Sequence, residues 1–202
     1  MRFLITGFAP FGTSKINPSY EAVRRLPEML GEHEIVRAEI PVVYDRCGDV
    51  LEELLDRVQP DVALCLGQAA GREGVSLENT AVNVKAASAP DNAGVTFSGE
   101  KIDPEGPESI PARLPLRELS QLLREAGIPT KISYSAGTYV CNNLFYRLLR
   151  YAEANDAHLR CGFIHIPPDE SQLPYFPAGT PFLPISEVVR ALKLTVAYLG
   201  AH

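Results

Sequence analysis

The chain has 202 residues, of which 46% are hydrophobic and 22% are charged, a composition typical of a soluble globular protein with a core. Its net charge is −6 and its basic residues are scattered, which argues against nucleic-acid binding because that requires clustered positive charge. The apolar runs are only strand-sized, and glycine and proline follow soon after Met1. We therefore expect no membrane partner, no secretory signal and a cytoplasmic location.

In the first half of the chain, apolar runs alternate with helical patterns. Residues 2–6 predict a strand, and Asn17 followed by Pro18 predicts the capped start of a helix over 17–30. The sequence then predicts a strand at 34–40, a helix at 46–58, a buried strand at 61–66 and a β-prone segment at 75–84.

The second half opens with residues 88–115, which are rich in Pro, Gly, Asp and Ser and predict a loop with little regular structure. A proline-rich connection is expected at 167–184. The remaining predicted elements are a helix at 115–126, a strand at about 130–134, a helix opening near Cys141, a strand at 161–166 and a helix at about 186–199.

This alternation predicts the fold class α/β. We expect residues 1–202 to form a single three-layer α/β/α domain around a mainly parallel twisted sheet. Sites in such folds gather in the loops that leave the carboxyl ends of strands. The loops at 7–16, at 67–74 and from 166 onward are therefore the expected site region.

The four cysteines do not form a C-x-x-C pair, so the sequence predicts neither a structural zinc site nor another metal site. Cys65 and Cys161 lie inside strand-like runs and are interpreted as small buried hydrophobic residues. Cys47 follows Asp45-Arg46 at a predicted helix start, where a packing role is again the simplest interpretation.

Cys141 lies where a turn marked by Gly137 leads into an apolar pattern of helical spacing. A thiol in the first turn of a helix meets free backbone N–H groups and the positive end of the macrodipole, which favour thiolate. The same N–H groups could bind an oxyanion formed beside the sulfur, and Gly137 would let the chain approach closely. A catalytic thiol and a packing thiol both remain open on these features alone.

A thiol nucleophile needs a base that can later protonate the leaving amine. His165 is the best of four histidines, because it ends the apolar run Gly162–Ile166 just before two prolines. Glu78, which interrupts an otherwise neutral strand, is the best carboxylate to orient the imidazole. A core histidine and a solvent-facing glutamate are the alternatives.

The segment Ile5–Gly12 follows a strand and contains glycine, but it matches neither phosphate-loop pattern and carries two phenylalanines. It predicts an apolar pocket lined by aromatic rings.

Five blocks together resemble the pyroglutamyl peptidase type I family, the pyrrolidone-carboxylate peptidases. They are "TGFAPFG" followed by "NPS", then "GQAAGR", "SAGTYVCN" and "FIHIP", in the family's order from Thr6 to Pro167. The resemblance implies a cysteine peptidase that removes an N-terminal pyroglutamyl residue from peptides and requires no cofactor. It also implies a homo-oligomer, by analogy a tetramer.

Carried onto this chain, the family's nucleophile, histidine and glutamate fall on Cys141, His165 and Glu78. The substrate-binding residues implied by the resemblance are Phe8, Phe11, Gln68 and Val140.

The chain also departs from the family pattern. Many bacterial relatives have Glu-Arg where this chain has Glu78-Asn79, and Asp-Ala-Arg where it has Ala86-Ala87-Ser88. The resemblance implies that this last arginine supports the electrostatics near the oxyanion, a charge that Ser88 cannot supply. Two alternatives stay open: a phosphorylase-like enzyme on a similar fold, and a non-catalytic binder of pyroglutamyl peptides.

Overall fold

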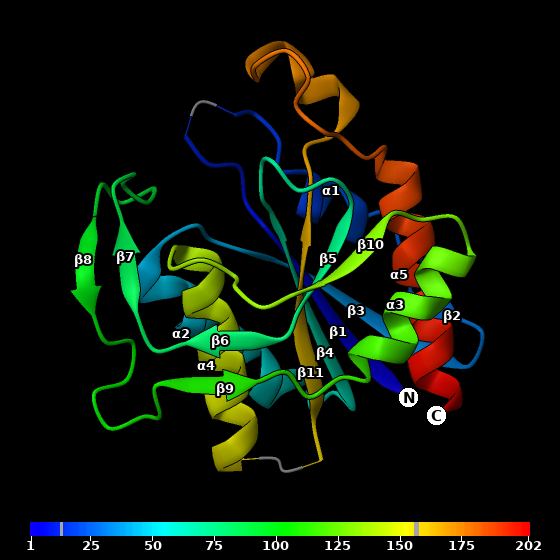
Figure 1. Cartoon of the computed structure of the whole chain (residues 1–202). Helices are drawn as coiled ribbons and strands as arrows, with labels where there is room; N and C mark the ends of the chain where they lie inside the picture. The colour runs from blue at the N-terminus through cyan, green and yellow to red at the C-terminus, as the bar shows by residue number, and fades with distance from the viewer. Residues whose placement is uncertain (13, 156–157) are drawn as a thin grey trace.

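A computed structural model describes residues 1–12, 14–155 and 158–202, and a seven-stranded sheet runs through this part of the chain (Figure 1). The strand order is β10-β5-β11-β4-β1-β3-β2. The strands are β1 Arg2–Phe8, β2 Met29–Leu30, β3 His33–Ile40, β4 Val62–Gln68, β5 Val75–Glu78, β10 Thr130–Ser133 and β11 Arg160–Ile166.

The sheet is mainly parallel, as the sequence predicts. The strands β3, β1, β4 and β11 run in one direction, and β5 pairs antiparallel with β11 and parallel with β10. The short β2 pairs antiparallel with β3. The fold class is α/β, with the sheet between two layers of helices.

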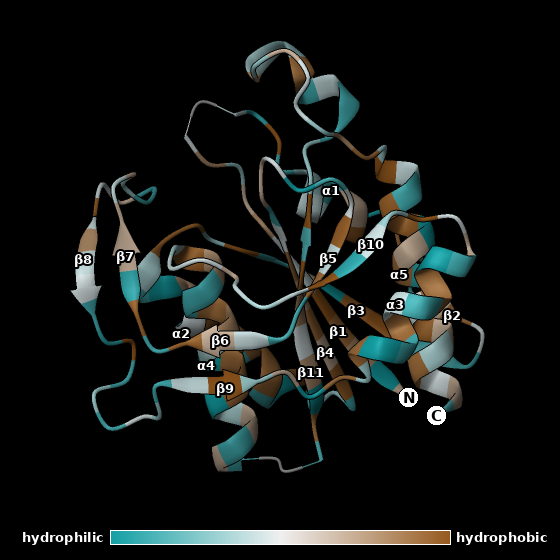
Figure 2. Cartoon of the chain, viewed as in Figure 1, coloured by the Kyte–Doolittle hydropathy of each residue, from teal (hydrophilic) through white to brown (hydrophobic). Residues whose placement is uncertain are grey.

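Five α-helices cover the sheet within the described residues: α1 Pro18–Val23, α2 Tyr44–Val58, α3 Leu116–Glu125, α4 Val140–Asn155 and α5 Ile185–Ala201. The helices α2 and α4 pack on one face, and α1, α3 and α5 pack on the other (Figure 1). Figure 2 shows apolar strands inside and polar residues on the outer helix faces. No helix in these residues is long and apolar enough to cross a membrane.

The helix predicted over 17–30 is too long. Asn17 caps it and Pro18 opens it as expected, but the helix ends at Val23. Pro27 cannot donate a helical hydrogen bond and disfavours helical geometry at the residue before it. The chain then forms β2 and turns at Gly31, which has a φ of 61°, into β3.

The prediction of little regular structure over 88–115 is wrong in part. The β-prone segment at 75–84 splits into β5 and β6 Thr80–Val82, and β6 pairs with β9 Ser109–Pro111. Another antiparallel pair joins β7 Lys85–Ala87 to β8 Phe97–Glu100. The proline-rich connection also contains a 3-10 helix, η1 Glu170–Tyr175, which begins with a capping box at Asp169.

Candidate functional site

Glu78 and His165 are brought together by the antiparallel pairing of β5 and β11. Glu78 lies opposite Phe163 in the register, so its side chain lies diagonally next to that of His165. The Nδ1 atom of His165 is 2.8 Å from the Oε1 atom of Glu78. Glu78 is fully buried and His165 is 3% exposed. The alternative of a solvent-facing glutamate is therefore wrong, and Glu78 forms a buried carboxylate–imidazole pair with His165.

The thiol of Cys141 lies on the same face of the sheet as this pair. A Cβ atom placed on Gly67 would be 2.9 Å from the Cys141 Sγ atom. Gly67 in β4 is the register partner of His165 in β11, and such partners lie about 4.8 Å apart with side chains on the same face. The ring of Phe163 packs beside both Gly67 and the His165 ring. The sulfur therefore lies over β4 on the face of the sheet that carries His165 in the neighbouring strand.

The acidity of Cys141 differs from the sequence-based expectation. The thiol is in the first turn of α4 as predicted, but burial raises its pKa to about 12, with further increases from Cys47 and Glu78. Its own backbone N–H has the opposite effect, which is smaller. Loss of hydration of the thiolate thus opposes the helix start, which alone would favour the thiolate.

Two asparagines fix the first turn of α4. The side chain of Asn142 accepts from the backbone N–H of Val82 and donates to the carbonyls of Val82 and Val84. Asn143 donates to the carbonyl of Tyr44 in α2. Because both amides are buried, these bonds hold the turn that carries Cys141 against β6 on one side and α2 on the other.

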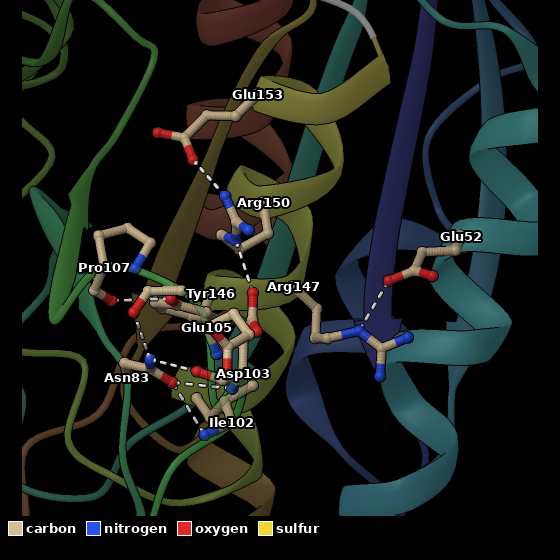
Figure 3. A network of polar contacts seen from close by, with 11 residues as sticks. Glu52, Asn83, Ile102, Asp103, Glu105, Pro107, Tyr146, Arg147, Arg150 and Glu153 are labelled. Carbon is tan, nitrogen blue, oxygen red and sulfur yellow. Dashed lines mark hydrogen bonds and ion pairs between the residues drawn. The ribbon is translucent and has the colours of Figure 1, made fainter.

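Farther along α4, polar contacts join the helix to neighbouring segments (Figure 3). Tyr146 donates to the carbonyl of Pro107, and Arg150 pairs with Asp103 at 2.9 Å. Asn83 accepts the backbone N–H groups of residues 102 and 103, which anchors this loop. Arg147 pairs with Glu52 in α2 at 2.7 Å. The helix is thus held along its length by α2 and by the segment that follows β6.

Gly137 has a different role from the one expected. Its φ is 76°, and a Cβ atom added there would meet no atom within 4 Å. The residue therefore provides left-handed backbone at the turn before α4, and not a close approach of two chain segments.

Arg72 is a site residue that the sequence analysis did not single out. Its Nη2 atom lies 3.1 Å from Glu78 Oε1 and donates to the carbonyl of Ser135 at 2.9 Å. The available signal was its position, because Arg72 ends the quoted block "GQAAGR" in a loop that leaves the carboxyl end of a buried strand.

The aromatic residues of the expected pocket lie at the carboxyl end of β1. Phe8 is the last residue of β1, is 2% exposed, and packs with its ring centroid 6.4 Å from that of Phe163. Phe11 is partly buried and packs against the same core. The rings of Phe8, Phe163 and His165 therefore follow one another on the face that carries Cys141. Residue 13 of the predicted 7–16 loop lies outside the described residues.

The side chain of Gln68 is hydrogen-bonded within the protein, and that of Val140 is buried. Gln68 ends β4 and its Oε1 atom accepts from Gln172 in η1 at 3.4 Å. The Val140 side chain is fully buried in the core. Ser88 follows β7 and lines a hollow of about 520 Å³ with Ala86, Thr96 and Phe97. Within the described residues, no group of three or more His, Cys, Asp or Glu could hold a metal ion.

Comparisons with known proteins identify the family to which this chain belongs. A family model described as "Pyroglutamyl peptidase" matches residues 1–200. The chain belongs to the pyroglutamyl peptidase family. A pyrrolidone-carboxylate peptidase of Bacillus subtilis is 41% identical over 199 residues, which cover 96% of this chain and 89% of the relative. Another from Levilactobacillus brevis is 39% identical and covers 100% of this chain and 99% of the relative.

Solved structures of pyroglutamyl peptidases have the same fold. Pyroglutamyl peptidase I from Bacillus amyloliquefaciens superposes with a TM-score of 0.95 at 39% identity, covering 100% of this chain and 97% of the other. A variant of pyrrolidone carboxyl peptidase from Pyrococcus furiosus gives a TM-score of 0.92 at 34% identity, covering 98% and 97%.

Family membership makes the chain a pyroglutamyl peptidase I, a cysteine-type omega peptidase and hydrolase that removes N-terminal pyroglutamate. The phosphorylase-like alternative has no support in these comparisons.

Proposed function

We propose that Cys141, His165 and Glu78 perform the hydrolysis as nucleophile, acid–base and orienting carboxylate. The observation that carries this assignment is the buried contact between Glu78 Oε1 and His165 Nδ1, on the face where the Cys141 sulfur meets Gly67. With Nδ1 donating to Glu78, the Nε2 atom of His165 is the nitrogen that can accept a proton from the thiol.

Because burial raises the pKa of Cys141 to about 12, the resting nucleophile is a thiol and needs a base at the moment of attack. His165 takes the thiol proton as the sulfur adds to the carbonyl carbon after pyroglutamate. The oxyanion receives hydrogen bonds from backbone N–H groups at the start of α4. His165 then protonates the departing amine, which leaves a thioester. Water activated by His165 hydrolyses the thioester and releases pyroglutamate.

The pocket that we propose at the carboxyl end of β1 would favour a pyroglutamyl group by what it excludes. A pyroglutamyl ring is flat and neutral, and the rings of Phe8 and Phe11 with backbone groups at Gln68 and Val140 suit its faces and its lactam edge. An ordinary N-terminus carries an ammonium ion, whose transfer into an apolar slot costs roughly several kcal/mol. Peptides with N-terminal pyroglutamate are therefore the substrates we assign to this chain.

The test is turnover of a fluorogenic pyroglutamyl amide by the wild-type protein and by Cys141→Ser. We expect the substitution to lower kcat by about three orders of magnitude or more, since it removes the nucleophile. Cys161→Ala is the matched control, because Cys161 is a buried thiol of the same sheet at the other end of β11. It should leave kcat nearly unchanged.

Two results would contradict this assignment. Near-normal turnover by Cys141→Ser would exclude the thiol as nucleophile. Binding of a pyroglutamyl peptide by the wild-type protein without release of product would favour the alternative of a non-catalytic binder. An alanyl amide with a free amino group, tested beside the pyroglutamyl amide, measures the rejection of charge.

We further propose that residues 1–202 form one domain, which a family match over residues 1–200 supports. A cytoplasmic location is supported by the fact that all four cysteines are thiols. A homotetramer is proposed from family resemblance alone, and sedimentation at several protein concentrations measures it directly.

A further inference from the structure

Arg72 joins three segments of the chain at a single point. It belongs to the loop that follows β4, and its Nη2 atom lies 3.1 Å from Oε1 of Glu78 in β5. The same nitrogen donates to the carbonyl of Ser135, in the loop that leads to Cys141. The guanidinium thus connects the carboxylate of the proposed triad with the segment that positions its nucleophile.

The electrostatic surroundings make this contact more than a surface ion pair. The Glu78 side chain is fully buried, while that of Arg72 is 23% exposed. Oε1 of Glu78 receives both Arg72 and His165, whereas Oε2 has no hydrogen-bond partner among the described residues. The charged or titratable groups found to act on this carboxylate are therefore Arg72, His165 and Cys141. Arg72 alone of these is a permanent cation.

We propose that Arg72 is a positioning residue for hydrolysis, one that holds the carboxylate of Glu78 aimed at His165. This inference rests on the proposed function of the triad. Because Oε2 of Glu78 has no hydrogen-bond partner among the described residues, the contact of Arg72 with Oε1 helps to fix the rotation of the carboxylate. A carboxylate that turns away from Nδ1 orients the imidazole poorly. The contact with Ser135 also fixes the loop before α4. Loss of Arg72 should therefore make the positions of both His165 and Cys141 less well defined.

The substitution Arg72→Gln removes the charge and keeps a polar side chain. We expect kcat for a pyroglutamyl amide to fall about 10- to 100-fold, because a misaligned catalytic group costs up to roughly that factor. The KM should stay within about twofold, because Arg72 contacts Glu78 and not the substrate. Arg72→Lys, which keeps the charge, should lose only about 3- to 10-fold in kcat.

Arg25→Gln is the matched control, because Arg25 is an exposed arginine beyond α1 that pairs only loosely with Glu21, at 3.9 Å. It should leave kcat and KM unchanged. The variant Arg72→Gln in a Glu78→Gln background adds a further test. If Arg72 acts mainly through Glu78, its removal there should lower kcat by clearly less than in the wild-type background, and the remaining loss measures the contact with Ser135.

The outcomes separate the two proposals. A wild-type protein without pyroglutamyl amidase activity refutes the triad itself. If the wild-type protein is active and Arg72→Gln has the same kcat, only the role of Arg72 is refuted. A raised KM at unchanged kcat in Arg72→Gln also refutes that role, because it would indicate that Arg72 binds substrate. A lower melting temperature at wild-type kcat would mark a purely structural role and also refutes the proposal. If Arg72→Gln does not fold, Arg72→Lys decides, and a kcat within twofold of wild type overturns the inference.

Discussion

The substitution Gly67→Ala should disable the site without removing any catalytic group. A Cβ atom at this position would lie 2.9 Å from Cys141 Sγ and 2.9 Å from Phe163 Cζ. Carbon atoms in ordinary contact are about 3.5–4.0 Å apart, so the sulfur or the ring must retreat by roughly 0.6–1 Å. Neither neighbour moves easily, because Phe163 is buried and Cys141 sits in a turn held by Asn142 and Asn143.

A displacement of about 1 Å in a reacting group can lower the rate about 100-fold, which corresponds to about 2.7 kcal/mol of activation free energy. Overpacking of a core typically lowers stability by about 1–3 kcal/mol. We therefore expect Gly67→Ala to fold, to melt at a lower temperature, and to turn over a pyroglutamyl amide about 10- to 100-fold more slowly.

Steady-state kinetics measures the effect on kcat, with the enzyme concentration corrected for the fraction of protein that is folded. The matched control is Gly162→Ala in β11, where the atom nearest the new Cβ would be Cδ1 of the flexible Leu114 side chain, at 2.4 Å, on the opposite face of the sheet. This control should lower stability and leave kcat nearly unchanged. A Gly67→Ala protein with wild-type kcat would refute the placement of the thiol against β4.

Three further predictions concern the thiols and the helix that carries one of them. Replacing Asn142 by Ala removes three partly buried hydrogen bonds to the backbone of Val82 and Val84, so urea denaturation should show a loss of about 2–4 kcal/mol in the free energy of unfolding; a loss below about 0.5 kcal/mol would contradict this. Burial raises the pKa of Cys65 to about 12, so the folded state keeps a proton that the unfolded state loses above about pH 8.5. The free energy of unfolding should therefore fall as pH rises from 9 to 11, by about 1.4 kcal/mol per pH unit for this thiol. In Cys65→Ala, the fall of the free energy of unfolding with pH should be shallower. Because burial raises the pKa of Cys141 to about 12, its alkylation by iodoacetamide without substrate should accelerate about tenfold per pH unit from 8 to 11. A plateau in the alkylation rate below pH 9 would indicate a preformed thiolate.

Local signals in the sequence determined the elements and the candidate groups. The cap at Asn17-Pro18, the buried run at 61–66 and the helical spacing after Cys141 each depend on neighbouring residues, and the structure has all three. The end of α1 was missed although Pro27 signalled it. The pairs β6–β9 and β7–β8 were missed because each strand is only three or four residues long and has its partner elsewhere in the chain.

By itself the sequence determined the residue types, the α/β class and, through five motif blocks, the family. Only the tertiary structure decided that Glu78 and His165, 87 positions apart, share a hydrogen bond, that Gly67 makes room for the sulfur, and that Arg72 reaches the carboxylate. It also showed that burial opposes the helix start in setting the pKa of Cys141, since desolvation depends on every segment packed around the thiol and no local pattern encodes it.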